Sequence, residues 1–202
     1  VVPFGGKIPF LGTNPIAFAV PGEGKDNFCL DMATSLSSWN NVMVHRALHK
    51  ALMPGWAVDK DGIETTSADA AVGLLPIGKY KGYGLGLMIE ILCSVVSGMP
   101  SGRNINKMYP LDKNKRKLGH FFLAIDISKV VPINIFRKRI SKVLKSLRSQ
   151  PTNKKVETIL VAGDRELAAL KQRSKDGIPI NKVIAEELDQ QAAKYNIKSL
   201  FK

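Results

Sequence analysis

The sequence predicts an α/β fold, because short apolar segments end in glycine, acid or hydroxyl turns that lead into segments with helical periodicity. Residues 28–30 lead into the turn DMATS at 31–35, and residues 158–161 lead into AGD at 162–164. Apolar residues also recur at helical spacing over 133–147, with basic residues between them. A chain of 202 residues is long enough to bury a substantial core, as one large domain or two small ones.

The composition is that of a globular protein, with 45% hydrophobic and 23% charged residues. No apolar run reaches the roughly 20 residues of a membrane helix, and Glu90 interrupts the longest one. We therefore expect a cytoplasmic protein without a membrane span, in which Cys29 and Cys93 are reduced core thiols. The first six residues contain neither an initiator methionine nor a signal-peptide pattern, so we expect the interior of a longer polypeptide.

The net charge of +13 is unevenly distributed along the chain. Residues 1–102 carry 7 Lys and Arg against 8 Asp and Glu, whereas residues 103–202 carry 23 against 9, a net charge of +14. A basic half either binds nucleic acid or forms solvated helix faces. Because the basic residues mostly lie opposite an apolar stripe, we favour solvated faces and expect no nucleic-acid partner.

The first predicted strand covers residues 16–20 and ends at Pro21. It follows the turn Gly12-Thr13-Asn14-Pro15, in which the proline favours an extended backbone at Asn14. The Thr13 hydroxyl and the Asn14 amide are then free to face a ligand. The alternative is that both side chains bond to their own loop, as Thr and Asn commonly do in turns.

The second predicted strand, at 28–30, places Asp31 at its end, where open α/β sheets hold ligands and where a carboxylate can accept hydrogen bonds from a ribose. An equally weighted alternative is that Asp31 or Thr34 caps a helix predicted over 36–51. His45 and His49 would share one face of that helix. Since no third ligand lies nearby in the sequence, we interpret them as surface histidines and predict no metal site.

The segment from 75 to 100 contains a glycine-rich turn with Lys79 and Lys81, followed by a long apolar helix. Exposed backbone N–H groups, the helix dipole and an ammonium group together make a site for phosphate or carboxylate. The alternative is a tight turn that leads into a helix buried on most faces. A short strand near 56–58, an Asp61-Gly62 turn and a helix start capped by Ser67 are expected before it.

The basic half begins with a polar loop over 102–118, followed by a strand over 120–126 that His120 opens. An amphipathic helix follows Pro132. The strand at 158–161 leads through Gly163 into a helix start, which is a second candidate for contact with a phosphate or adenosine. A final helix is predicted over about 181–195.

Several common site motifs are absent from the sequence. GxGxxG with a downstream acid, GxxxxGK[ST] and GxSxG do not occur, and no Cys/His pair suggests a nucleophile with its base. Residue spacing alone therefore indicates an anion or nucleotide binder on an α/β frame.

Six sequence blocks, in order, resemble the type-2 malate/L-lactate dehydrogenase family, which also contains ureidoglycolate and sulfolactate dehydrogenases. The blocks are GTNPIAFAVP, LDMATS, GWAVDKDGIETT, LLPIGKYKGYGLGLMIEIL, SGxPSGRNxxxMY and LGHFFLAIDI, over roughly residues 1–130. The resemblance implies a mixed-sheet nucleotide-binding fold that is not of the Rossmann type. It further implies a homodimer that transfers hydride between NAD or NADP and a small 2-hydroxy acid such as malate or L-lactate.

The resemblance also implies roles for individual residues. The cofactor would contact Asp31, Met32 and Ala33, together with Lys81, and it would reach Gly163, Asp164 and Arg165 in the second glycine turn. Thr13 and Asn14 would lie beside the nicotinamide and the substrate. Residues 1–126 would form the dinucleotide-binding core, and 127–202 the C-terminal helix-strand-helix part of the same fold.

The sequence departs from the family pattern in three places. The family's acid/base histidine and its substrate-binding Arg and His lie in a segment before the one that matches Val1. We therefore assign no catalytic residue and expect this chain alone to bind cofactor but to turn over poorly. Asn40-Asn41 replaces a family Gly-Lys, and Ala162-Gly163-Asp164 replaces Pro-Gly-Glu. Two alternatives stay open, a ureidoglycolate dehydrogenase and a truncated, non-catalytic dinucleotide-binding or dimerisation module.

Overall fold

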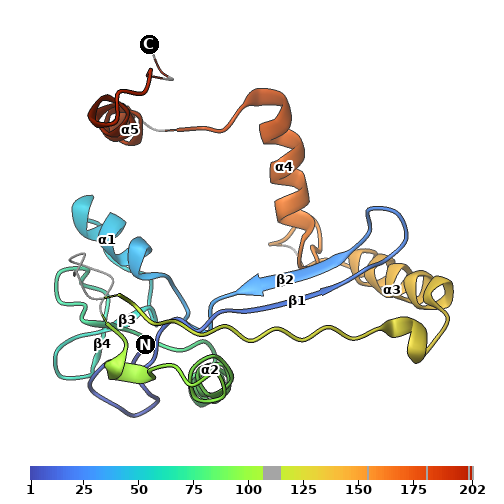
Figure 1. Ribbon diagram of the computed structural model, residues 1–202, viewed down its shortest axis with the longest axis horizontal. Coiled ribbons are helices and arrows are strands. Elements are labelled where there is room, and N and C mark those ends of the chain that lie inside the picture. Colours follow the sequence, from blue (N-terminus) through green and yellow to red (C-terminus); the bar gives the residue numbers. More distant parts are fainter. Residues whose placement is uncertain (107–114, 154, 181, 200, 202) are drawn as a thin grey trace. The chain divides into compact units, whose positions relative to one another are not determined.

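The computed structural model describes residues 1–106, 115–153, 155–180, 182–199 and 201 (Figure 1). Contacts divide the chain into two compact units, Val1–Val143 and Leu144–Lys202. The first unit contains all the described strands and the helices α1 and α2. The second contains the helices α4 and α5, and the helix α3 (Ile133–Arg148) crosses the boundary between them. The two units are considered separately below.

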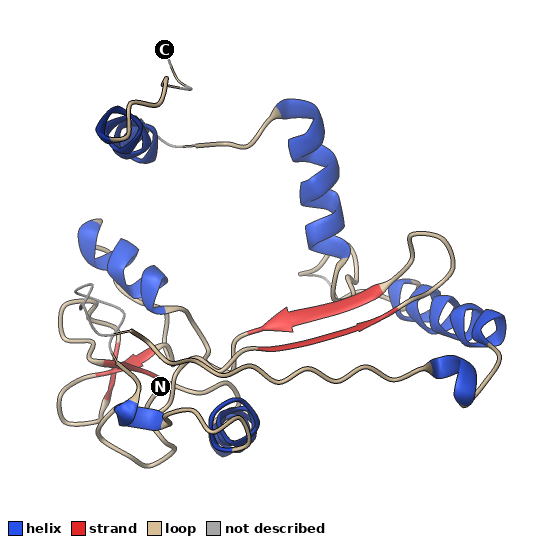
Figure 2. Cartoon of the chain, viewed as in Figure 1, coloured by secondary structure: helices blue, strands red, loops and turns tan. Residues whose placement is uncertain are grey.

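An antiparallel hairpin of β1 (Ile16–Val20) and β2 (Phe28–Met32) is the most regular sheet element of the first unit (Figure 2). Its register pairs Ile16 with Met32 and Val20 with Phe28. The sequence predicted β1 with its observed bounds and predicted β2 two residues too short. Asp31 and Met32 therefore belong to the strand rather than to the turn after it. Cys29 lies on an exposed part of this hairpin, so the expectation that it is a core thiol was wrong.

The helix α1 (Trp39–Ala47) begins at Ser38, whose side chain accepts a hydrogen bond of 3.1 Å from the Asn41 amide. The predicted caps Asp31 and Thr34 are thus both wrong, because the residues between Thr34 and Ser38 form a bridge and a bend instead of a first helical turn. Asn41 also donates from Nδ2 to the Ser37 hydroxyl at 3.3 Å. The start of this helix is held by local hydrogen bonds of its own residues.

His49 lies beyond the C-terminal end of α1, with a φ of 51°. The His49 amide donates to the Arg46 carbonyl at 3.1 Å and the Lys50 amide donates to the His45 carbonyl at 2.8 Å, which is a Schellman termination. The sequence predicted that His45 and His49 share one face of this helix. That prediction was wrong, because His49 lies outside the helix. Within the described residues, no group of three His, Cys, Asp or Glu side chains is arranged to hold a metal ion.

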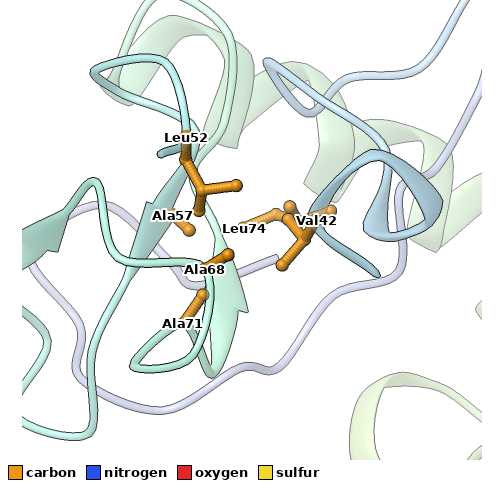
Figure 3. Packing of buried hydrophobic residues seen from close by; sticks show 6 residues of the cluster. All are labelled: Val42, Leu52, Ala57, Ala68, Ala71 and Leu74. Carbon is orange, nitrogen blue, oxygen red and sulfur yellow. The ribbon is translucent and has the colours of Figure 1, made fainter. Parts of the chain in front are cut away.

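A small three-stranded sheet supports the main hydrophobic core of this unit (Figure 3). Its antiparallel strands follow the order β4 (Glu64–Thr65), β3 (Ala57–Val58), β5 (Gly73–Leu74). The predicted helix start at Ser67 is a single turn, in which the Ser67 hydroxyl accepts from the Ala70 amide at 3.3 Å. The core cluster consists of Val42, Leu52, Ala57, Ala68, Ala71 and Leu74.

The glycine-rich turn leads into α2 (Tyr80–Glu90), which continues as one π-helical stretch, Ile91–Val95. The prediction that this helix is buried on most faces was wrong for the residues that the structure describes. Gly82, Gly86, Ile89 and Glu90 are buried. On another side the exposed apolar residues are Met88, Ile91, Val95 and Val96, with exposed fractions of 43–65%.

Residues 119–125 form a long uncoiled segment where the sequence predicted a strand (Figures 1 and 2). Within the described residues, none of them makes a backbone hydrogen bond, so the strand prediction was wrong for lack of a pairing partner. Phe122 is 89% exposed and Leu123 is 75% exposed. The predicted loop over 102–118 lies partly outside the described residues, since 107–114 are among those omitted.

The helix α3 follows Pro132, as the sequence predicted, and it is anchored on the hairpin turn. The buried Ser141 hydroxyl accepts a hydrogen bond of 2.9 Å from the Glu23 amide. In the second unit, α4 (Asp164–Asp176) and α5 (Lys182–Lys194) contain no buried residue. Residues 158–161, predicted as a strand, are not in a ladder. None of the described helices has the length and apolar character that a bilayer span requires.

Candidate functional site

The end of β2 and the start of α2 are joined by backbone hydrogen bonds. The Ile77 amide donates to the Thr34 carbonyl at 3.0 Å, and the Leu36 amide donates to the Leu75 carbonyl at 2.9 Å. Ser35 and Pro76 form an isolated antiparallel bridge between these two bonds. The DMATS turn and the glycine-lysine turn, which lie about 45 residues apart in the sequence, therefore form one junction.

The Gly12-Thr13-Asn14 turn is attached to the same junction through Thr34. The Thr34 amide donates to the Thr13 carbonyl at 2.9 Å. The Thr34 hydroxyl donates to the Thr13 and Asn14 carbonyls at 3.0 and 3.1 Å. The structure thus brings the predicted substrate-side residues, Thr13 and Asn14, next to the predicted cofactor segment at 31–33. It ties both to the turn that precedes Lys81.

Asn14 has a role that neither sequence interpretation described. Its Nδ2 donates to the Gly86 carbonyl at 2.9 Å and to Glu90 Oε2 at 2.8 Å, so both amide hydrogens are engaged by α2. Its backbone φ is 37°, so the extended conformation expected before a proline was wrong. The bonds to α2 stabilise this uncommon backbone conformation.

Glu90 is the residue that sequence reasoning missed. Its side chain is 5% exposed, and Oε1 accepts a hydrogen bond of 2.6 Å from the Gly102 amide. The sequence signal that could have identified Glu90 is that it is a single acid inside an otherwise apolar helix. In the sequence analysis this acid serves only to argue against a membrane span.

The start of α2 is open toward solvent. Lys79 precedes the helix with φ 58° and ψ −123°, and its side chain makes no capping hydrogen bond. Lys79, Tyr80 and Lys81 are exposed. Uncapped N–H groups beside two ammonium groups are suited to an anionic ligand. Asp31 is also exposed on β2, while Met32 and Ala33 are half-buried.

The second glycine turn belongs to the other unit. Gly163 precedes α4 with a φ of 102°, in the left-handed region that glycine adopts readily. Asp164 accepts from Arg148 Nε at 2.9 Å and Nη2 at 2.7 Å, and also from the Val161 amide at 3.0 Å. The hydrogen bond from Arg148 lowers the pKa of Asp164. Arg165 is exposed, whereas the Asp164 carboxylate is engaged within its own unit.

Comparison of the chain with known proteins identifies its family. The sequence model of the malate/L-lactate dehydrogenase family matches residues 1–189. The chain belongs to the malate/L-lactate dehydrogenase family. The resemblance read from the six sequence blocks is therefore confirmed, together with a fold of mixed helices and small sheets.

Individual members of this family are similar to the chain over much of its length. Ureidoglycolate dehydrogenase (NAD(+)) of Escherichia coli is 40% identical over 149 residues, which are 74% of this chain and 43% of the relative. Malate dehydrogenase of Pyrococcus horikoshii is 34% identical over 210 residues, covering 99% of this chain and 57% of the relative.

A solved malate dehydrogenase structure from Entamoeba histolytica superposes with a TM-score of 0.89 at 26% identity. The match covers 99% of this chain and 59% of that one. The chain thus spans about half the length of the malate/L-lactate dehydrogenase family members it matches.

Proposed function

We propose that the chain is part of an oxidoreductase that transfers hydride between NAD or NADP and a small 2-hydroxy acid or 2-oxo acid, such as malate or L-lactate. The observation that carries this proposal is the hydrogen-bonded junction of the Gly12-Thr13-Asn14 turn, the DMATS turn and the uncapped start of α2. The nucleotide-binding fold would be of the family's mixed-sheet kind rather than Rossmann, and the working form a cytoplasmic homodimer.

The residues at the junction suit the parts of a dinucleotide. Lys81 and the uncapped start of α2 would bind the pyrophosphate, since an ammonium group and a helix N-terminus both attract anions. Asp31, exposed on β2 beside Met32 and Ala33, would accept hydrogen bonds from a ribose. Gly163, Asp164 and Arg165 would provide the second cofactor contact. Within that turn, Arg165 would supply charge while Arg148 holds the Asp164 carboxylate.

When bound, the nicotinamide supplies or accepts the hydride. Thr13 would orient the substrate beside the nicotinamide. Asn14 would hold the turn in place, because both of its amide hydrogens are engaged by α2. A new hydroxyl also requires a proton donor, and we assign that role to none of the described residues. The present chain would therefore bind and orient, and would show little turnover alone.

Two alternatives have support of their own. The E. coli relative is named for ureidoglycolate and NAD(+), which favours that substrate and nucleotide as the second candidate. A non-catalytic module that binds a dinucleotide or only dimerises is the other candidate, because the junction offers groups suited to an anion while we assign the proton donor to none of the described residues. The exposed basic faces of α3 and α4 fit solvated helices, and we propose neither a nucleic-acid nor a membrane partner.

Titration of the chain with NADH and with NADPH, followed by nicotinamide fluorescence, tests the proposal. We expect saturable binding of at least one nucleotide. Replacing Lys81 with Ala should weaken binding about tenfold, because an exposed charge pair and hydrogen bond to phosphate are lost. Lys25→Ala is the matched control, since Lys25 is exposed in the first unit outside the junction. Equal affinity of wild type and Lys81→Ala would remove Lys81 from the site.

A further inference from the structure

We propose that Glu90 is a positioning residue: its buried carboxylate fixes the Gly12-Thr13-Asn14 turn and thereby shapes the part of the site next to the nicotinamide. The ligand in this statement rests on the proposed function. The role of Glu90 in holding the turn rests on geometry alone, so the two are tested separately.

The geometry connects three segments through one side chain. Oε2 accepts from Asn14 Nδ2 at 2.8 Å, and Oε1 accepts from the Gly102 amide at 2.6 Å. Asn14 is 76 residues from Glu90 in the sequence, and Gly102 is 12 residues from it. The turn before β1, the helix α2 and the short helix Gly102–Asn104 are therefore joined at a carboxylate that is only 5% exposed.

The chemistry of the contacts requires a carboxylate at this position. Both partners are N–H donors, and a carboxylate offers two acceptor oxygens and no donor. Hydrogen bonds to an ionised acceptor are shorter and stronger than those between neutral groups. Glutamine has the same shape but replaces one oxygen with an NH2 group, so one buried N–H would face another donor. Glu90→Gln thus breaks one contact without a change in volume.

The position of the turn depends on these contacts through Asn14. Glu90 and the Gly86 carbonyl engage both hydrogens of the Asn14 amide. The Asn14 and Thr13 carbonyls in turn accept from Thr34, next to the cofactor segment at 31–33. Loss of the Glu90 contact would loosen Thr13 relative to Ala33. The start of α2, where Lys81 lies, is fixed separately through Ile77 and Leu75.

Amide hydrogen exchange tests the structural part without any ligand. In Glu90→Gln we expect the Gly102 and Thr34 amides to exchange about tenfold faster than in wild type, because the bonds that hold them are weakened. Glu23→Gln removes the same charge from an exposed side chain and should leave both rates unchanged. Unchanged rates in Glu90→Gln would overturn the proposal, whether or not the chain binds a nucleotide.

Ligand titration tests the positioning part. We expect Glu90→Gln to bind NADH about tenfold more weakly than wild type while its affinity for ADP-ribose, which lacks the nicotinamide, stays the same. An equal loss for both ligands would show a general structural role and overturn positioning, as would no loss for either. If wild type binds neither ligand, the proposed function fails, and the exchange rates alone decide whether Glu90 fixes the turn.

A second variant guards against misfolding of Glu90→Gln. Asn14→Gly breaks the same contact from the other side and suits the positive φ of this position. Asn14→Gly should also accelerate exchange of the Thr34 amide and weaken NADH binding. The variant with both substitutions should bind NADH no more weakly than whichever single variant has the larger loss of affinity. Fully additive effects would mean that Glu90 acts through a partner other than Asn14.

Discussion

Lys79 has a backbone conformation that belongs to glycine. Its φ of 58° and ψ of −123° immediately precede α2, next to Gly78 with a φ of 55°. A lysine in such a region costs about 1–3 kcal/mol. Lys79→Gly should therefore raise the free energy of unfolding by about 1 kcal/mol, measured by urea denaturation. Lys81→Gly, inside the helix, is the control and should lower it by about 1 kcal/mol. A loss of stability in Lys79→Gly would contradict the claim that the Lys79 backbone is strained.

The sequence identified the turns that meet at the candidate site, whereas the roles of their residues stay predictions. The glycine-lysine turn and the DMATS segment were recognisable because glycine, lysine and hydroxyl residues cluster there, although Asp31 lies in β2 rather than in a turn. The contacts of Asn14 with α2 were not predicted, because its partners Gly86 and Glu90 lie 72 and 76 residues away. A contact of that separation leaves no periodic trace in the sequence.

Gly82 and Gly84 in α2 differ in the space that surrounds them. A Cβ on Gly82 would lie 1.9 Å from the Ile77 carbonyl oxygen, whereas a Cβ on Gly84 would meet no atom within 4 Å. Gly82→Ala should thus destabilise the chain by more than about 2 kcal/mol. Gly84→Ala should stabilise it by up to about 1 kcal/mol, because alanine favours the helix. Urea unfolding of the pair measures both effects, and similar effects of the two substitutions would refute the packing argument.

The start of α4 depends on an ion pair that acid should break. The Arg148 hydrogen bonds lower the pKa of Asp164, so the folded state holds the ionised form more strongly than the unfolded state does. The stability from this pair is fully present above the unfolded pKa of about 4 and is lost as the pH falls through the lower folded value.

We expect Asp164→Asn to cost on the order of 1 kcal/mol at pH 7 and progressively less below pH 4. Unfolding followed by circular dichroism over pH 2.5–7 provides the measurement. Glu166→Gln, in the same first turn of α4, is the control. A pH-independent difference between Asp164→Asn and wild type would show that the ion pair is not the cause.

The elements that the sequence predicted well are those that local rules determine. β1 needed only its apolar residues and the stop at Pro21, and α3 needed only Pro132 and its periodic apolar residues. The helix predicted over 36–51 was too long at both ends, because Ser38 and His49 terminate it through hydrogen bonds of their own. The strands predicted over 120–126 and 158–161 failed because a ladder needs a partner strand, which local sequence cannot provide.

At the scale of the whole molecule, family membership came from the order of six blocks rather than from any single residue. The contacts divide the chain at Val143, within α3. The functional division that we propose, with the dinucleotide-binding core in 1–126 and the remainder in 127–202, places α3 with the C-terminal part.

We expect the segment at 119–125, which has no regular secondary structure, to promote aggregation in concentrated solution. It presents Phe121, Phe122, Leu123 and Ile125, at least 44% exposed, on a backbone that forms no backbone hydrogen bond with the part of the chain that the structure describes. Such a segment resembles a free sheet edge, which copies of the same chain can extend into fibrils. Phe122→Lys should therefore raise the concentration at which light scattering appears, because a charge opposes stacking. Lys117→Ala, outside this segment, should not raise that concentration. If Phe122→Lys leaves the concentration unchanged, the surface that causes aggregation lies elsewhere.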